Sequence, residues 1–251
     1  MIYSVIMECL LLTVLCMKIL SEITPDINLV LVSVTGVVQA YLLYEIVKMF
    51  VVIFRQDKNR SEILFPFRQG KYLVTDGGNS KISRLMNYHF YSPVHKKNKT
   101  NYSMLFATDI VRIDNQRRRF LPAQNEDYPI FGEKVFSPVS GVVVKVENSI
   151  NDNTPYSGGY PYNTGNTIVI QNGNRYFLLG HLKKGSISVK VGDVINGNDY
   201  LAEAGNSGYS ERSHIHMQLV ESDTENFWKG IGISIGFNNK NLFKNRIIRM
   251  E

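Results

Sequence analysis

Three histidines in the C-terminal half of the sequence have a spacing that can do metal chemistry. His181 follows a run of apolar residues, and His214 and His216 stand two positions apart before an apolar alternation. Side chains at positions i and i+2 of a β-strand point to the same face, so His214 and His216 are expected side by side. Neutral imidazoles held in this way suit a metal ion, Zn²⁺ above all. The pattern predicts a metal site on a late strand.

The elements that must position these histidines are short strands. From Phe65 onward, short apolar stretches are separated by Gly, Asn and Pro, and helical periodicity is almost absent. Strands are predicted at residues 72–75, 141–146, 167–170, 176–179 and 214–220. Asn172-Gly173-Asn174 predicts a tight hairpin, because Asn and Gly tolerate the positive φ of such turns. We therefore expect an all-β core, built as an antiparallel β-sandwich or open barrel.

Four short motifs, taken in order, resemble the lysostaphin-type zinc endopeptidases, which cleave peptide cross-links in bacterial cell walls. They are Gly180-His181-Leu182, the VKVGD of 189–193, the GNSG of 205–208 and the His-Ile-His of 214–216. The likeness covers roughly residues 65 to 237. It implies the duplicated hybrid motif fold and a bound zinc ion. It also implies that His216 is a zinc ligand, and that His181 and His214 form the acid/base and oxyanion-stabilising pair.

One part of the family pattern is incomplete in this chain. The resemblance implies an HxxxD motif whose histidine and aspartate supply the other two ligands; Asp109 matches the aspartate, but Leu105 stands where the histidine belongs. Two protein ligands are too few for tight zinc binding. A divergent branch of the family replaces this histidine and has an N-x-H feature, which Asn87-Tyr88-His89 resembles. We expect His89 to be the third ligand, with His95 in a basic loop, or no role for His89, as alternatives.

The first 54 residues predict a membrane segment. Residues 1–20 and 29–54 are mostly apolar and are separated by a polar turn at 21–26. Each stretch is long enough as a helix to cross about 30 Å of hydrocarbon. We therefore expect a transmembrane helical hairpin over 1–54, a linker at 55–64 and a peptidase-like domain at 65–251. A signal peptide for the first stretch and a surface-lying amphipathic helix for the second are the alternatives.

Charges around the second apolar stretch bear on the orientation of the chain. Arg55, Lys58 and Arg60 follow it directly, and the positive-inside rule would then keep the following domain in the cytoplasm. An enzyme that cleaves cell wall acts outside, however, and we expect the domain to face outside from the cell membrane. The net charge of +6 suits attraction to acidic wall polymers or anionic lipid.

Two further features limit the function classes. The cluster at residues 117–119, Arg-Arg-Arg, is predicted to be a solvated basic loop, because no recognised nucleic-acid-binding fold surrounds it. No nucleic-acid partner is expected. The two cysteines, Cys9 and Cys16, lie in the first apolar stretch, so the predicted peptidase domain has no disulfide and no cysteine nucleophile.

These patterns predict a membrane-anchored zinc metalloendopeptidase that hydrolyses peptide bonds in bacterial peptidoglycan and contacts lipid through its N-terminal helices. The alternative is an inactive scaffold of the same fold that binds cell wall or activates a partner hydrolase. Residues 189–197 also resemble the hairpin of biotinyl and lipoyl carrier domains, but no lysine is displayed at a hairpin tip. The sequence names neither the bond cleaved nor the oligomeric state.

Overall fold

The computed structural model describes residues 18, 19, 22, 28–54, 60–89, 101–113, 122–158 and 164–251. The chain divides into two compact units, residues 1–51 and 52–251.

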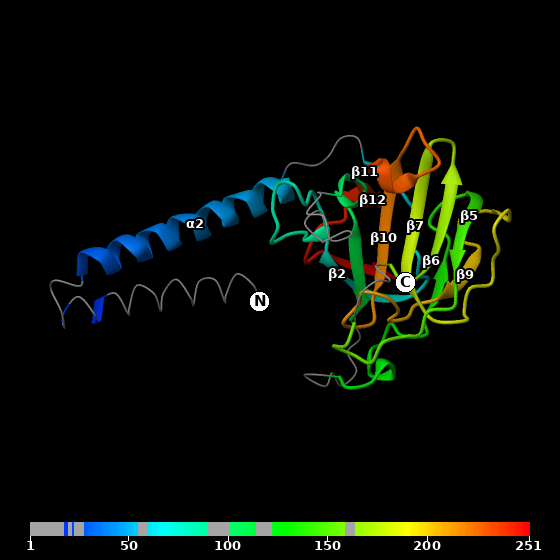
Figure 1. Cartoon of the computed structure of the whole chain (residues 1–251), viewed down its shortest axis with the longest axis horizontal. Coiled ribbons are helices and arrows are strands. Elements are labelled where there is room, and N and C mark those ends of the chain that lie inside the picture. Colours follow the sequence, from blue (N-terminus) through cyan, green and yellow to red (C-terminus); the bar gives the residue numbers. More distant parts are fainter. Residues whose placement is uncertain are drawn as a thin grey trace. The chain divides into compact units, whose positions relative to one another are not determined.

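Helix α2 (Asn28–Phe54) begins in the first unit (Figure 1). Its stretch Ser33–Phe54, of 22 residues with a mean hydropathy of 1.9, is long and apolar enough to cross a membrane. Signal sequences and the core helices of soluble proteins meet the same criterion. The other helix of the expected hairpin, at residues 1–20, lies almost wholly outside the described residues.

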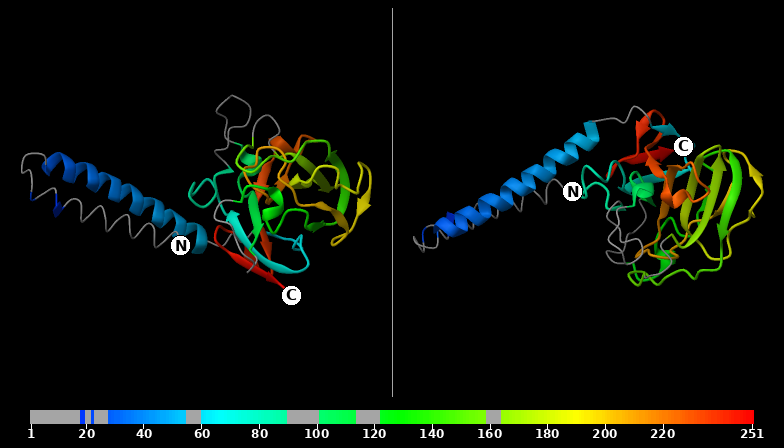
Figure 2. Two further views of the ribbon diagram at one scale, coloured as in Figure 1. Left: turned by 90° about the horizontal axis from the view of Figure 1, so that it is seen from below. Right: turned by 45° about the horizontal axis from the view of Figure 1, so that its top comes forward.

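An open antiparallel sheet forms the centre of the second unit. Its strand order is β14-β2-β3-β10-β7-β6-β5-β8, and β11 pairs with β10 beside this path. The bounds are β2 (Gly70–Asp76), β3 (Thr108–Arg112), β5 (Gly141–Glu147), β6 (Asn166–Asn172), β7 (Arg175–Leu182), β8 (Val194–Ile195), β10 (Ile215–Glu221), β11 (Ile231–Ile233) and β14 (Ile247–Met250). Strands β2, β10, β7, β6 and β5 follow one another across Figure 1, and Figure 2 shows the twist of the sheet. The two end strands are not paired with each other in the described residues, so the sheet is not a closed barrel.

Two smaller sheets complete the domain. Strand β4 (Lys134–Phe136) pairs with β9 (Tyr200–Glu203). Strand β12 (Ile235–Phe237) pairs with β13 (Lys240–Asn241) and, in parallel, with β1 (Ser61–Glu62), which falls in the stretch expected to be a linker. Beyond residue 60, the helices in the described part are the short 3₁₀ turns η2 (Tyr102–Met104), η3 (Asn125–Asp127) and η4 (Phe227–Lys229). The predicted β core is confirmed.

Alternation along β10 separates a core face of the sheet from a site face. Ile215, Met217 and Leu219 belong to the main hydrophobic core, which also draws buried residues from β4, β9 and β12. His216 and Gln218 alternate with them and therefore lie on the other face. On that face a second cluster around Leu178, Tyr176 and Phe227 covers the part of the sheet beyond Gln218. The polar site and this apolar cluster thus share one face.

One predicted hairpin turn and one motif shared with the family lie in the described residues. The hairpin at Asn172 to Asn174 is confirmed: Asn172 pairs with Arg175, and Gly173 in the two-residue loop has φ +60°. Residues 189–193, which resemble a family hairpin, contain no strand in the described structure. The backbone amide of Lys190 donates to the Asp193 carboxylate across 2.9 Å, and Gly192 has φ +94°. A side chain therefore closes this turn, and β8 begins only after it.

Candidate metal centre

Asp109 and His216 lie directly opposite each other across the ladder between β3 and β10. Residues paired in this way have neighbouring side chains on one face of a sheet. His216 Nδ1 is 3.0 Å from Asp109 Oδ1, and the two side chains are 2% and 15% exposed. On the other side of β10, Gly180 pairs with His216, and a Cβ there would lie 3.0 Å from the Thr164 carbonyl oxygen. The pairing of β3 with β10 therefore brings the side chains of Asp109 and His216 together.

His89 approaches the same carboxylate from the segment that follows β2. Its Nε2 is 3.2 Å from Asp109 Oδ2, and its ring centroid is 4.9 Å from that of His216. One ligand atom from each of His89, Asp109 and His216 can be chosen so that all three lie within 4.8 Å of one another. The structure thus gathers the three residues expected to bind metal. His95, the alternative to His89, lies outside the described residues, as does the basic cluster at 117–119.

The atoms that face one another in this cluster are the ones a cation needs. His89 Nδ1 is 2.7 Å from Asn87 Oδ1, so the Nδ1 proton donates there and the Nε2 lone pair faces Asp109. His216 Nε2 is 3.1 Å from Gln218 Oε1, which leaves the Nδ1 lone pair facing Asp109. In the neutral rings these lone pairs and the carboxylate repel one another unless a cation, either a proton or a metal ion, lies among them. Two imidazole nitrogens and a carboxylate oxygen fit Zn²⁺.

His214 and His181 lie beside this cluster. His214 immediately precedes β10, which begins one residue later than predicted. The Nε2 atom of His214 is 3.4 Å from Asp109 Oδ2. Its Nδ1 is 2.8 Å from the carbonyl oxygen of Arg212, so Nδ1 carries the proton. The His181 ring centroid is 4.5 Å from that of His214, and His181 Nδ1 donates to the carbonyl oxygen of Ser207 at 2.7 Å. In both rings Nδ1 is engaged by a backbone carbonyl, so Nε2 is the nitrogen that can interact with a bound substrate.

A β-bulge brings His181 to the site face. Asn166 pairs with Leu182 while Ile168 pairs with Leu179, so β7 holds one residue more than β6 at this point. Gly180 is paired with His216 and lies on the same face of the sheet. Regular alternation would therefore place His181 on the opposite face. The bulge re-aims the side chain, and His181 takes φ +59° to do so.

Burial and charge set the protonation of the cluster. Burial would raise the pKa of Asp109, but the charges of His89 and His214 hold that pKa well below its usual value. Burial lowers the pKa of His181 well below its usual value, and the neighbouring His214 and His216 lower it further. Burial also lowers the pKa of His216, against the bond to Asp109. For His89 and His214 the same burial is outweighed by Asp109, and their pKa values are raised.

A cleft of about 220 Å³ opens onto these five residues. Exposed tyrosines at positions 88 and 209 and the charged residues Glu211 and Arg212 also line it. Asp76 lines it as well, and sequence reasoning missed this residue. A register shift in β2 pairs Asp76 with Asp109, and burial and that neighbouring carboxylate raise the pKa of Asp76 against the opposing charge of Lys244. The only sequence signal was its place at the end of a predicted strand.

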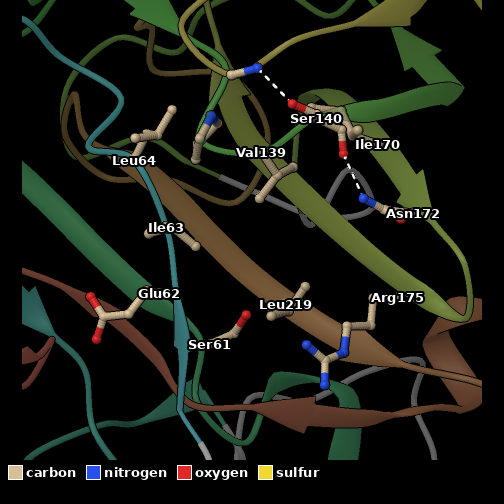
Figure 3. A pocket seen from close by; sticks show the side chains of 12 residues that line it. Ser61, Glu62, Ile63, Leu64, Val139, Ser140, Ile170, Asn172, Arg175 and Leu219 are labelled. Atoms are coloured by element: carbon tan, nitrogen blue, oxygen red, sulfur yellow. Dashed lines mark hydrogen bonds between the residues drawn. The ribbon is translucent and has the colours of Figure 1, made fainter. Parts of the chain in front are cut away.

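A second, larger cavity lies on the core face of the sheet. Its volume is about 530 Å³, and residues 61–64 form one wall, with Ile170 of β6 and Leu219 of β10 opposite (Figure 3). Its charged lining residues are Glu62 and Arg175. None of the residues expected to do chemistry lines it. The five residues expected to do chemistry line the smaller cleft instead.

Comparisons with known proteins show a match to one peptidase family. The model of peptidase family M23 matches residues 127–227, a span that holds His181, His214 and His216 but begins after Asp109. The chain is 31% identical over 140 residues to an uncharacterized metalloprotease of Buchnera aphidicola, covering 55% of this chain and 28% of that protein. It is 29% identical over 110 residues to the peptidoglycan DD-endopeptidase ShyA of Vibrio cholerae, covering 43% and 23%.

Among solved structures, the catalytic domain of lysostaphin from Staphylococcus simulans is similar at 18% identity, with 63% of this chain and 84% of that chain covered and a TM-score of 0.34. The chain spans less than a third of the length of the curated relatives that it matches.

Proposed function

We propose that this chain, a member of the lysostaphin-type peptidases of family M23, is a zinc metalloendopeptidase that hydrolyses peptide bonds in bacterial peptidoglycan. The observation that carries the proposal is the convergence of His89, Asp109 and His216, whose ligand atoms lie within 4.8 Å of one another. These residues come from three separate segments, so local sequence does not account for their meeting. The similarity to a protein named as a peptidoglycan DD-endopeptidase supports the choice of substrate.

Three protein ligands suit a catalytic site rather than a structural one. Catalytic zinc sites keep a fourth position open, whereas structural sites are closed by four protein ligands. His89, Asp109 and His216 would hold the ion, and the cleft gives access to them. When bound, zinc supplies a Lewis acid that polarises the scissile carbonyl and lowers the pKa of a water to about 7.

His214 and His181 would move protons and stabilise charge. Each ring donates its Nδ1 proton to a backbone carbonyl, at Arg212 and Ser207, and this fixes Nε2 as the reactive atom. With its Nδ1 proton engaged, each ring can accept a proton at Nε2 from a nucleophile or donate one there to a developing oxyanion. His181 and His214 would therefore act together as the acid/base and oxyanion-stabilising pair.

The proposal includes membrane anchoring through the N-terminal segment, with the peptidase domain outside the cell. The stretch Ser33–Phe54 supports an anchor by its length and hydropathy. The expected substrate supports the outward orientation, against the positive charges that follow the helix. Limited proteolysis of intact spheroplasts tests this orientation. Degradation of the domain without lysis is expected, and its protection until lysis would reverse the assignment.

The activity is tested on the full chain in detergent. We expect stoichiometric zinc, and release of soluble fragments with new amino termini from purified peptidoglycan. His216→Ala should lose both, while Asn196→Ala, a change in a turn outside the cleft, should keep both. A folded wild-type protein without zinc or lytic activity would instead support the inactive scaffold. Equal lysis by wild type and His216→Ala would refute the zinc mechanism.

A further inference from the structure

Asn87 is fully buried and commits its whole side-chain amide around His89. Its Nδ2 donates to the carbonyl oxygens of Gly78 and Ala107, each at 2.8 Å. Its Oδ1 accepts from the backbone amide of His89 at 3.1 Å and from the ring Nδ1 at 2.7 Å. A flipped amide would face its NH₂ to an N–H and its oxygen to two carbonyls, so the orientation is determined. Asn87 therefore places the proton of His89 on Nδ1.

Gln218 stands in the same relation to His216 but at the other ring nitrogen. It is fully buried, two residues after His216 on β10, and its Oε1 is 3.1 Å from His216 Nε2. Its own Nε2 has no hydrogen-bond partner among the described residues. An unpaired buried donor costs about 1–3 kcal/mol, which an apolar side chain of similar shape would avoid. Gln218 thus lowers the stability of the folded state, while its Oε1 provides an acceptor for His216.

We propose that Asn87 and Gln218 are positioning residues that select opposite ring nitrogens as metal ligands. Asn87 leaves Nε2 of His89 facing Asp109, and Gln218 leaves Nδ1 of His216 facing it. The inference rests on the proposed function, because it presumes a zinc ion at Asp109. Outer partners of this kind fix the tautomer and ring orientation of a ligand histidine, and their loss typically costs 10–100-fold in metal affinity.

The geometry explains why the two nitrogens differ. His216 sits on a strand directly opposite Asp109, so the ring atom nearest its backbone, Nδ1, lies beside the carboxylate. His89 reaches in from outside the ladder, and its distal atom, Nε2, meets the other carboxylate oxygen. Each amide binds the ring nitrogen on the far side from Asp109. The two ligands therefore need acceptors at different ring positions, and the fold provides one for each.

Asn166 provides a matched control for Asn87. It is also fully buried, and its Nδ2 donates to the carbonyl oxygens of Ile150 and Leu182, while its Oδ1 accepts from the amide of Ile150. None of these side-chain bonds involves a histidine ring. Replacing Asn166 removes the same kind of backbone-bridging amide without touching a proposed ligand.

The experiment measures zinc affinity of the full chain in detergent by competition with a chromogenic chelator. Asn87→Ala and Gln218→Met should each weaken binding 10–100-fold. Gln218→Glu, which keeps an acceptor, should stay within a few-fold of wild type. Asn166→Ala should lower the unfolding temperature of the metal-free protein but leave the affinity unchanged. Gln218→Met should leave that temperature unchanged or raise it, which separates positioning from folding.

A second readout identifies the protonated nitrogens directly. In the zinc-loaded protein, ¹⁵N chemical shifts of the imidazole nitrogens should show His89 protonated on Nδ1 and His216 protonated on Nε2. Wild-type zinc affinity in Gln218→Met, or a proton on Nδ1 of His216, would overturn the inference and leave the proposed function intact. A wild-type protein that binds no zinc would overturn both. The two failures are therefore distinguishable.

Discussion

The two halves of the candidate metal centre are held in place by different means. Asp109 and His216 are paired across β3 and β10, and backbone hydrogen bonds of the sheet set their separation. His89 belongs to no strand, and the Asn87 amide holds both its backbone and its ring. The ladder-held half depends on main-chain bonds that tolerate many side chains nearby. The loop-held half depends on one particular side chain.

The loop around His89 is nevertheless well tied to the sheet. Ser80 donates from both its amide and its hydroxyl to the carbonyl oxygen of Leu105, and Gly77 donates to Met86. The Asn87 amide then links Gly78 to Ala107, next to the start of β3. Side-chain and turn hydrogen bonds thus take over the task that a β-ladder performs for the other two residues. Replacing residues on each side should test this difference.

The largest effect is expected from Asp109, whose carboxylate lies close to three of the histidines of the site. Asp109→Ala removes the carboxylate within 3.4 Å of His89, His214 and His216. We expect no measurable zinc binding and no lytic activity, assayed by metal content and by peptidoglycan solubilisation. Asp193→Asn, which changes a turn carboxylate elsewhere in the domain, should retain both. Stoichiometric zinc in Asp109→Ala would show that the ladder-held half is not the centre of the site.

The loop-held half is broken by His89→Ala, which should abolish stoichiometric zinc because two ligands remain. The double variant His89→Ala/Leu105→His restores a histidine at the spacing of the family motif. We expect no recovery of zinc, because Leu105 does not line the cleft and its carbonyl is tied to Ser80. Zinc content and circular dichroism of both variants check this. Recovery of zinc would mean that the loop position matters less than the geometry indicates.

The sequence predicted those parts of the site that local pattern determines. The i, i+2 spacing placed His214 and His216 together, and Asn172 to Asn174 marked the hairpin that joins β6 to β7. The pairing of His216 with Asp109 is a register between strands about a hundred residues apart, which no local pattern contains. Alternation alone would have turned His181 away, because the bulge in β7 depends on its pairing with β6. Asp76 was missed for the same reason, since a register shift in β2 pairs it with Asp109.

His181 represents a third way of holding a side chain, on a strand but at a bulge. His181→Gly should lose lytic activity but retain zinc, because the ring is not among the proposed ligands. Its free energy of unfolding should change by no more than about 1 kcal/mol, because relief of the φ +59° conformation offsets the packing that is lost. His181→Ala loses the same packing but keeps the backbone strain, so it should unfold at a lower temperature than His181→Gly. The opposite order would show that the bulge is unstrained.

The smallest effect is expected from Asp76, which borders the ladder-held half without belonging to the proposed ligand set. Asp76→Asn should change zinc affinity less than tenfold, because the variant removes a nearby charge but no proposed ligand. Its raised pKa means that the stability contribution of Asp76 is present below the ordinary aspartate pKa and is lost as pH rises through the folded-state value. At neutral pH, Asp76→Asn removes a carboxylate that repels Asp109, so the metal-free variant should be slightly more stable than wild type. Urea unfolding of the metal-free proteins across acidic and neutral pH checks the sign. A variant less stable than wild type at neutral pH would mean that the ion pair with Lys244, at 3.4 Å, outweighs the repulsion.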